Sequence, residues 1–118
     1  MKENIIEKKS FDFAVEIIAT YKYLTSEQKE FILSKQLLRS GTSIGANITE
    51  AIGGQSSKDF IHKLKISRKE TNETLYWLKL LEATNYLNVE LSTNMIKSCK
   101  ELLKILTAII KTMEAKLK

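Results

Sequence analysis

The chain contains no proline, and its four glycines all lie between residues 41 and 54. Proline removes a backbone donor and glycine raises the entropic cost of a helix, so long stretches without either residue favour helix. Such stretches flank the glycine segment on both sides, and apolar residues recur through them at three- and four-residue spacing. The sequence therefore predicts an all-α fold built from long helices.

Helix start and stop signals divide the chain into four predicted helices, over about residues 10–24, 26–52, 57–84 and 89–117. Thr25 to Gln28 form a capping-box pattern, Gly53 and Gly54 should end the second helix in the left-handed conformation, and Ser56 and Asn88 are plausible N-caps. We expect the second helix to continue through Gly41–Gly45. Short loops favour antiparallel neighbours, so we predict one domain, residues 1–118, folded as an up-down-up-down four-helix bundle.

Two of these helices carry clear apolar faces. In the first, the expected core face is Phe11, Ala14, Ile18 and Tyr21, widened by Phe13, Ile17 and Leu24. In the fourth, a coiled-coil-like seam is followed by a second column: Met95, Cys99, Leu102, Leu106, Ile109 and Met113, then Ile96, Leu103, Ile110 and Leu117. Together the two columns form an apolar face wider than the core of one bundle requires, which predicts contacts with other subunits. The alternative is that the core of a single chain covers the whole face.

The middles of the second and third helices are polar. The expected turn between them places Arg39 opposite Glu70 and Glu73, and Glu50 opposite Asp59, with Gly41 and Gly45 allowing the two backbones to approach closely. We predict a partly buried polar lock formed by Arg39, Ser43, Asn47, Glu50, Glu70 and Glu73. Removing one partner of a buried ion pair costs about 3–5 kcal/mol.

The net charge of +5 is unevenly distributed. Residues 1–54 carry no net charge, so the whole excess lies in residues 55–118. Lysines follow one face of the fourth helix at seven-residue spacing, and a shorter basic row with His62 follows the third. The candidate nucleic-acid contacts are Lys97, Lys100, Lys104, Lys111, Lys65 and Lys69, with Lys58 and Lys118 beside them. Such rows would hold a phosphate backbone without reading bases, and the alternative is an ordinary solvated helix face.

No catalytic, cofactor or metal site is predicted. Ferritin-like di-metal sites need two Glu-x-x-His units, whereas this chain has one histidine, in Asp59-Phe-Ile-His62. Cys99 falls on an apolar seam, where a small core residue is expected. Gly41–Gly45 lacks the Gly-Lys-Ser/Thr ending of a phosphate loop. A metalloenzyme therefore remains a minor alternative, which bound metal in the purified protein would support.

The cellular compartment is predicted from features that the sequence lacks. A single cysteine fits a reducing compartment, the first residues lack the apolar run of a signal peptide, and no run approaches the ~20 apolar residues that span a membrane. We expect a cytoplasmic protein with no membrane partner.

Two segments carry a family resemblance. Gln36–Glu50 (QLLRSGTSIGANITE) and Ile66–Leu81 (ISRKETNETLYWLKLL) resemble the bacterial four helix bundle proteins encoded in intervening sequences of 23S rRNA genes. Members often have proline at the position of Gly45 and glycine at that of Ala51. The resemblance implies an all-α bundle that assembles as a homopentamer. It also implies kinship with the accessory protein of diversity-generating retroelements, which binds a reverse transcriptase and nucleic acid.

These observations lead to two main functional hypotheses. The first is a non-enzymatic homo-oligomeric bundle that binds RNA or a ribonucleoprotein partner through its basic rows. The second is a purely structural oligomer or protein-binding adaptor, for example for a reverse transcriptase.

Overall fold

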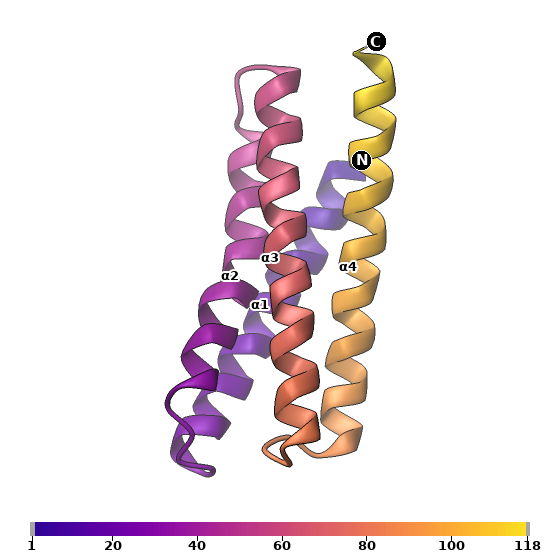
Figure 1. Cartoon of the computed structure of the whole chain (residues 1–118). Helices are drawn as coiled ribbons and strands as arrows, with labels where there is room; N and C mark the ends of the chain where they lie inside the picture. The colour runs from indigo at the N-terminus through magenta and orange to yellow at the C-terminus, as the bar shows by residue number, and fades with distance from the viewer. Residues whose placement is uncertain (1, 118) are drawn as a thin grey trace.

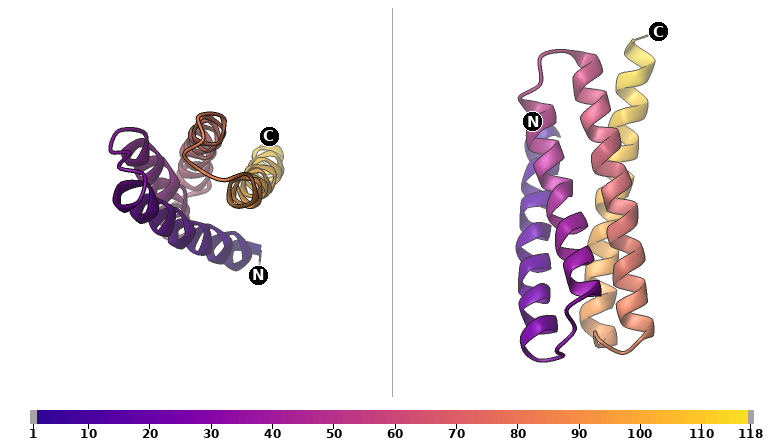
Figure 2. Two further views of the ribbon diagram at one scale, coloured as in Figure 1. Left: turned by 90° about the horizontal axis from the view of Figure 1, so that it is seen from below. Right: turned by 60° about the vertical axis from the view of Figure 1, so that its left-hand side comes forward.

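The predicted all-α bundle is confirmed. The computed structural model describes the backbone of residues 2–117 and the side chains of residues 5–117. Its helices are α1 (Lys2–Ser26), α2 (Leu33–Ile52), α3 (Ser57–Ala83) and α4 (Val89–Lys116), arranged up-down-up-down in a rod of 49 × 22 × 20 Å (Figure 1). The α1–α2 and α3–α4 loops lie at one end of the rod, and the α2–α3 loop lies at the other (Figure 2).

Helix α1 differs from the prediction in its start and in its buried face. It begins at Lys2, about two turns before residue 10. Its buried residues are Ile6, Ser10, Phe13, Ile17, Thr20 and Leu24, whereas Phe11 and Ile18 of the expected core face are exposed. The hydroxyls of Ser10 and Thr20 donate to carbonyl oxygens of their own helix, at 3.0 and 2.9 Å. Two polar residues therefore lie in the buried stripe of α1. The hydrophobicity of the sequence alone does not predict that they are buried.

The junction between α1 and α2 also differs. Thr25 and Ser26 form no capping box, because their hydroxyls donate to the carbonyls of Tyr21 and Lys22 inside α1. Helix α2 begins at Leu33 instead of residue 26. Its free amides are satisfied by the Glu30 carboxylate, which accepts from the backbone N–H groups of residues 32, 33 and 34 at 3.2, 2.9 and 2.7 Å. Burial raises the pKa of Glu30, but these hydrogen bonds outweigh that effect and the pKa is lowered overall.

Helix α2 is continuous through its glycines, as expected, but the glycines face α1 and not α3. A Cβ at Gly41 would lie 2.7–2.9 Å from side-chain carbons of Ile17, and one at Gly45 would lie 3.3 Å from the Ser10 hydroxyl. The glycines therefore permit a close approach of α1 to α2. Neither Gly53 nor Gly54 adopts a positive φ, so the predicted left-handed ending of α2 is wrong.

Small hydroxyl side chains form hydrogen bonds between α2 and α3. The Thr74 hydroxyl lies 2.9 Å from that of Ser40, and the Ser67 hydroxyl donates to the carbonyl of Ile44 at 2.9 Å. All three side chains are buried. Small side chains that satisfy one another let two helices pack closely without leaving unpaired polar groups.

The N-cap predictions for α3 and α4 are confirmed. Ser56 accepts from the amide of Asp59 at 3.1 Å, and Asn88 accepts from the amide of Leu91 at 2.8 Å. Helix α4 buries Met95, Cys99, Leu102 and Leu106 as predicted and then Ile110, whereas Ile109 and Met113 are only partly buried.

The second apolar column of α4 is mostly covered, and α1 exposes more large apolar side chains than that column does. Of the second α4 column, Ile110 is buried, Ile96 and Leu103 are partly buried, and Leu117 alone is exposed. On α1, by contrast, four large apolar side chains are exposed: Ile5, Phe11, Val15 and Ile18. These side chains are exposed because α1 packs against the core with its other face.

Candidate nucleic-acid interface

One row of exposed side chains runs along α3. Its positions follow the three- and four-residue spacing of one helix face, and all are exposed: Lys58, His62, Lys65, Lys69, Asn72, Tyr76 and Lys79. The row contains four lysines and no acidic residue. We call it the α3 row. The sequence analysis placed Lys58, His62, Lys65 and Lys69 in it but missed Asn72, Tyr76 and Lys79, although the same spacing continues through them.

A second row runs along the outer side of α4. Lys97, Lys100, Lys104, Thr107 and Lys111 are exposed at the same helical spacing, again without an acidic residue. The next position, Glu114, contacts Lys65 of α3 at 2.7 Å. We call it the α4 row. Lys97, Lys104 and Lys111 succeed one another at intervals of about 10 Å along the helix axis. Lys118 lies outside the described residues.

The lysines of these rows are mostly not neutralised within the chain. Among residues 5–117, one lysine of the two rows forms an ion pair, and this lysine is Lys65. Several acidic side chains of α3 and α4 lie on other sides of the bundle: Glu70 and Glu73 contact Arg39, Glu101 contacts Lys9, and Glu82 accepts from Ser92. The α3–α4 face therefore keeps most of its positive charge available to an anionic partner.

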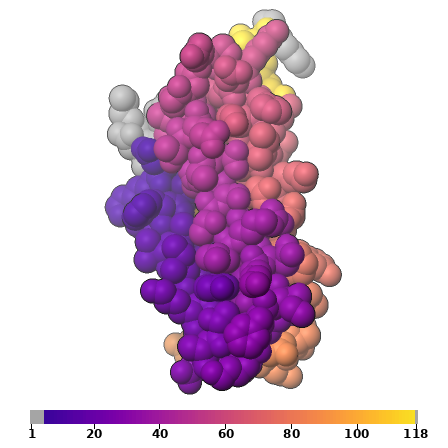
Figure 3. All heavy atoms as spheres, turned by 90° about the vertical axis from the view of Figure 1, so that its left-hand side faces the viewer, coloured from indigo at the N-terminus to yellow at the C-terminus, as the bar shows by residue number. Residues whose placement is uncertain are grey.

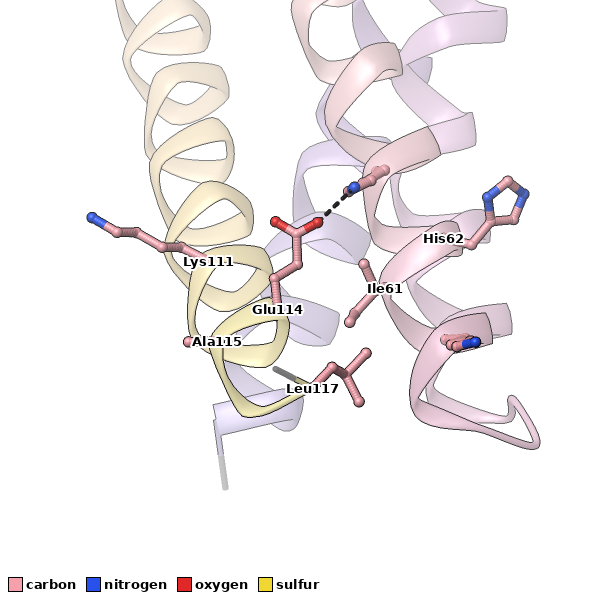
Figure 4. A pocket seen from close by; sticks show the side chains of 8 residues that line it. Ile61, His62, Lys111, Glu114, Ala115 and Leu117 are labelled. Atoms are coloured by element: carbon pink, nitrogen blue, oxygen red, sulfur yellow. Dashed lines mark ion pairs between the residues drawn. The ribbon is translucent and has the colours of Figure 1, made fainter.

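A cleft lies between the start of α3 and the end of α4, and of the cations of the two rows Lys65 extends into it. The cleft has a volume of about 780 Å³. Ile61 and Leu117 extend into it from opposite sides, and the Lys65–Glu114 ion pair bridges it, whereas His62 and Lys111 point away from it (Figure 4). The cleft is thus the space left where the last turns of α4 separate from α3. The basic surface is the outer face of the two helices.

The predicted polar lock lies at the outer edge of the α2–α3 contact. Arg39 contacts Glu73 at 3.2 Å and Glu70 at 3.6 Å, but its side chain is 54% exposed, and of the two carboxylates only Glu70, at 15%, is largely covered. Ser43 donates to the carbonyl of Arg39, and Asn47 to that of Ser43, so both bond within α2. The Arg39 ion pairs are therefore partly buried on the Glu70 side and open to solvent on the Arg39 side, and Ser43 and Asn47 take no part in them.

The register of α2 against α3 differs by about one turn from the prediction. Glu50 contacts Lys63 at 2.8 Å instead of lying opposite Asp59. Helix α3 begins at Ser57, as predicted, so the shift comes from the path of the connection before it, which makes each α2 residue meet a position further along α3. The buried polar contacts in this register are those of Ser40, Ser67 and Thr74, which the sequence analysis did not identify.

The groups considered for catalysis or metal binding remain apart. His62 is exposed, and no three His, Cys, Asp or Glu side chains among the described residues are grouped as metal ligands would be. Cys99 is buried and donates to the carbonyl of Thr71 at 3.4 Å. Burial raises the pKa of its thiol to about 12, so the reactive thiolate is scarce at neutral pH.

The opposite side of the bundle has a different character. Figure 3 shows the face formed by α1 and α2. A groove of about 650 Å³ lies between these helices and is lined largely by small side chains, among them Ser10, Ala14, Gly45 and Ala46, with Phe11 at its side. Phe11 is 67% exposed, and Val15 and Ile18 continue the apolar stripe along α1. We call Phe11, Val15 and Ile18 the α1 stripe.

No helix among residues 2–117 is long and apolar enough to cross a membrane.

Comparison with known proteins identifies the family. No curated protein matches the chain. A crystal structure from Bacteroides thetaiotaomicron, of a protein with unknown function from the S23 ribosomal protein family, is 54% identical; the match covers 94% of this chain and 99% of that chain, with a TM-score of 0.92. The family model of the 23S rRNA-intervening sequence proteins matches residues 2–108. The chain therefore belongs to the 23S rRNA-intervening sequence protein family.

Proposed function

We propose that this protein is a non-enzymatic helical bundle that binds RNA through the backbone phosphates, using the outer face of α3 and α4. One observation carries the proposal: every member of the α3 and α4 rows is exposed, and none of these members is acidic. Side-by-side rows of lysines attract a polyanion, and flexible ammonium groups contact phosphates without selecting a sequence. The family name, which links its members to 23S rRNA genes, agrees with an RNA ligand.

The test is the salt dependence of binding. We would measure the affinity for a fluorescein-labelled 20-nucleotide RNA by anisotropy across a range of salt concentrations. Six phosphate contacts would give a slope of about −4 in the logarithm of affinity against that of salt concentration. The charge-reversal variant is Lys97→Glu, Lys104→Glu and Lys111→Glu, and the matched control reverses Lys22, Lys29 and Lys35 on the other hairpin.

The α4 variant should lose more than about tenfold in affinity and about 2 from the magnitude of the slope, whereas the control should lose little. Equal effects of both variants would mean that only net charge matters, and salt-independent binding would contradict the proposal. The 260/280 nm absorbance ratio of the protein as first purified offers an independent check for bound RNA.

We further propose that the protein associates with copies of itself through the α1 stripe and the adjacent α1–α2 groove. Exposed large apolar side chains on one helix favour burial against another subunit, and the small residues of the groove permit close packing. The family resemblance implies a ring of five. In such a ring, the α3–α4 faces of all subunits would repeat the basic rows and raise the avidity for RNA.

The alternative function, a structural oligomer or an adaptor for a protein such as a reverse transcriptase, is favoured by the same α1 stripe. It would place the functional contact on the first hairpin and leave the basic rows solvated. Absence of copurifying nucleic acid, together with no measurable affinity for added RNA, would support this alternative.

A further inference from the structure

Tyr76 is a large exposed aromatic residue within the basic α3 row. Its side chain is 58% exposed, one turn from Asn72 on one side and from Lys79 on the other. Lys69 lies two turns back on the same face. Exposed aromatic residues elsewhere in the described chain have other surroundings: Phe11 belongs to the α1 stripe, and the Tyr23 hydroxyl accepts from Gln28.

The Tyr76 ring is held by its neighbour. It contacts the ring of Trp77 edge to face, with centroids 5.1 Å apart and planes at 71°. Trp77 is partly buried and packs against the core, so it is a fixed support. An aromatic ring that is both exposed and oriented loses little conformational entropy when a flat ligand stacks on it.

The exposed surroundings of Tyr76 favour a nucleic acid over an apolar partner. Its exposed neighbours on the α3 row are lysines and an asparagine, not the aliphatic side chains that would surround a protein-docking aromatic residue. A lysine on each side of an aromatic platform is the arrangement by which proteins bind single strands: bases stack on the ring and phosphates contact the ammonium groups. Lys69 and Lys79 are about 15 Å apart along the helix, a span of a few nucleotides.

We infer that Tyr76 stacks on an unpaired base, with Lys69 and Lys79 contacting the flanking phosphates, so that the RNA segment held here is single-stranded. This inference rests on the proposed function and limits the proposed ligand to single-stranded RNA. In a duplex, both faces of each base are covered by neighbouring base pairs, so a tyrosine on a helix surface cannot stack on them.

The test compares single-stranded and duplex RNA of equal length, each at several salt concentrations, for the native protein, Tyr76→Ala and Tyr76→Phe. Tyr76→Ala should weaken single-strand binding by about 5- to 150-fold, the range expected for one base–aromatic stack, without changing the salt slope or duplex affinity. Tyr76→Phe should retain the native affinity, because the ring is kept. Phe31→Ala, which removes an exposed ring from the α1–α2 loop, is the matched control and should have little effect.

Trp77 provides a direct readout, because it is the only tryptophan of the chain and lies beside the proposed stacking site. Single-stranded RNA should quench its emission in the native protein and in Tyr76→Phe, but much less in Tyr76→Ala. Native single-strand affinity and native quenching in Tyr76→Ala would overturn the inference. If the α4 charge-reversal variant still lost RNA binding in that case, the proposed function would stand without it; if the native protein bound no RNA at all, both would fall.

Discussion

The two helical hairpins of this bundle expose different chemistry. The first, α1 and α2, carries the α1 stripe of apolar side chains beside a groove of small residues. The second, α3 and α4, carries two rows of exposed lysines, and neither row has an acidic member. Residues 1–54 have no net charge and residues 55–118 hold the whole excess of +5. Because each hairpin forms one side of the bundle, a charge asymmetry along the chain gives one side with no net charge, which carries the α1 stripe, and one cationic side.

This division suggests that assembly and RNA binding use separate surfaces. A substitution on one hairpin should then leave the property of the other intact. The following changes test that separation and the packing beneath it, from the largest expected effect to the smallest.

The double variant Phe11→Lys and Val15→Lys should prevent the proposed self-association. Burying two ammonium groups in an apolar subunit interface is costly, whereas in a single chain both side chains lie in solvent. Light scattering should show a fall to the mass of one chain, with circular dichroism and the melting curve of the isolated bundle little changed. The matched control, Lys69→Ala and Lys79→Ala, should keep the native mass. An unchanged mass for the α1 variant would place self-association elsewhere.

Gly41→Ala should lower the free energy of unfolding by about 1–3 kcal/mol, because the added methyl overlaps Ile17 at 2.7–2.9 Å. Gly45→Ala is the control in the same helix: its nearest contact is 3.3 Å, so the better helix propensity of alanine offsets most of the strain. Urea unfolding measures both. A second change, Ile17→Val, should relieve part of the strain in Gly41→Ala. Equal stabilities for the two alanine variants would contradict a close approach at Gly41.

Glu30→Gln should cost about 0.5–2 kcal/mol at neutral pH, since the charged cap of α2 is weakened. The native pKa of Glu30 is lowered, so its charge stabilises the fold above the pKa of the unfolded state. That contribution is lost as pH falls through the lowered, folded-state pKa. The difference in stability between native and Glu30→Gln protein should therefore shrink on acidification. A difference that stays constant with pH would exclude the carboxylate as the cap.

Arg39→Ala should cost less than about 1 kcal/mol, far below the 3–5 kcal/mol expected for a buried pair. The Arg39 guanidinium is half-exposed, so solvent screens its attraction to Glu70 and Glu73. Thermal unfolding would measure the effect, and the removal of Lys63, which contacts Glu50 on the same edge, gives a comparison. If Arg39→Ala lowered the free energy of unfolding by several kcal/mol, the Arg39 cluster would act as a structural lock after all.

Much of this fold is readable from local signals. The long proline-free stretches led to helices, and Ser56 and Asn88 marked helix starts correctly because a cap involves only residues three positions apart. The Arg39–Glu73 contact was also predicted, since an antiparallel hairpin brings these positions together. The α3 row was predicted only as far as Lys69, because two uncharged residues, Asn72 and Tyr76, separate Lys69 from Lys79.

Other features follow from contacts between helices. The start of α2 depends on Glu30, whose carboxylate reaches forward to three amides in a geometry that no standard capping pattern describes. The register of α2 on α3 depends on the connection between them, and an error of one turn moved Glu50 from Asp59 to Lys63.

The sequence by itself determined that this chain forms four antiparallel helices and that its positive charge lies in the second half. Helical periodicity and charge are properties of each segment and need no partner. Only the tertiary structure decided which face of α1 is buried: Ser10 and Thr20 lie inside, and Phe11 and Ile18 lie outside. A hydroxyl that bonds to its own helix can be buried at little cost, and the small side chain lets α2 approach through Gly45. Packing therefore favoured close approach on one side of α1 and left Phe11, Val15 and Ile18 on the surface.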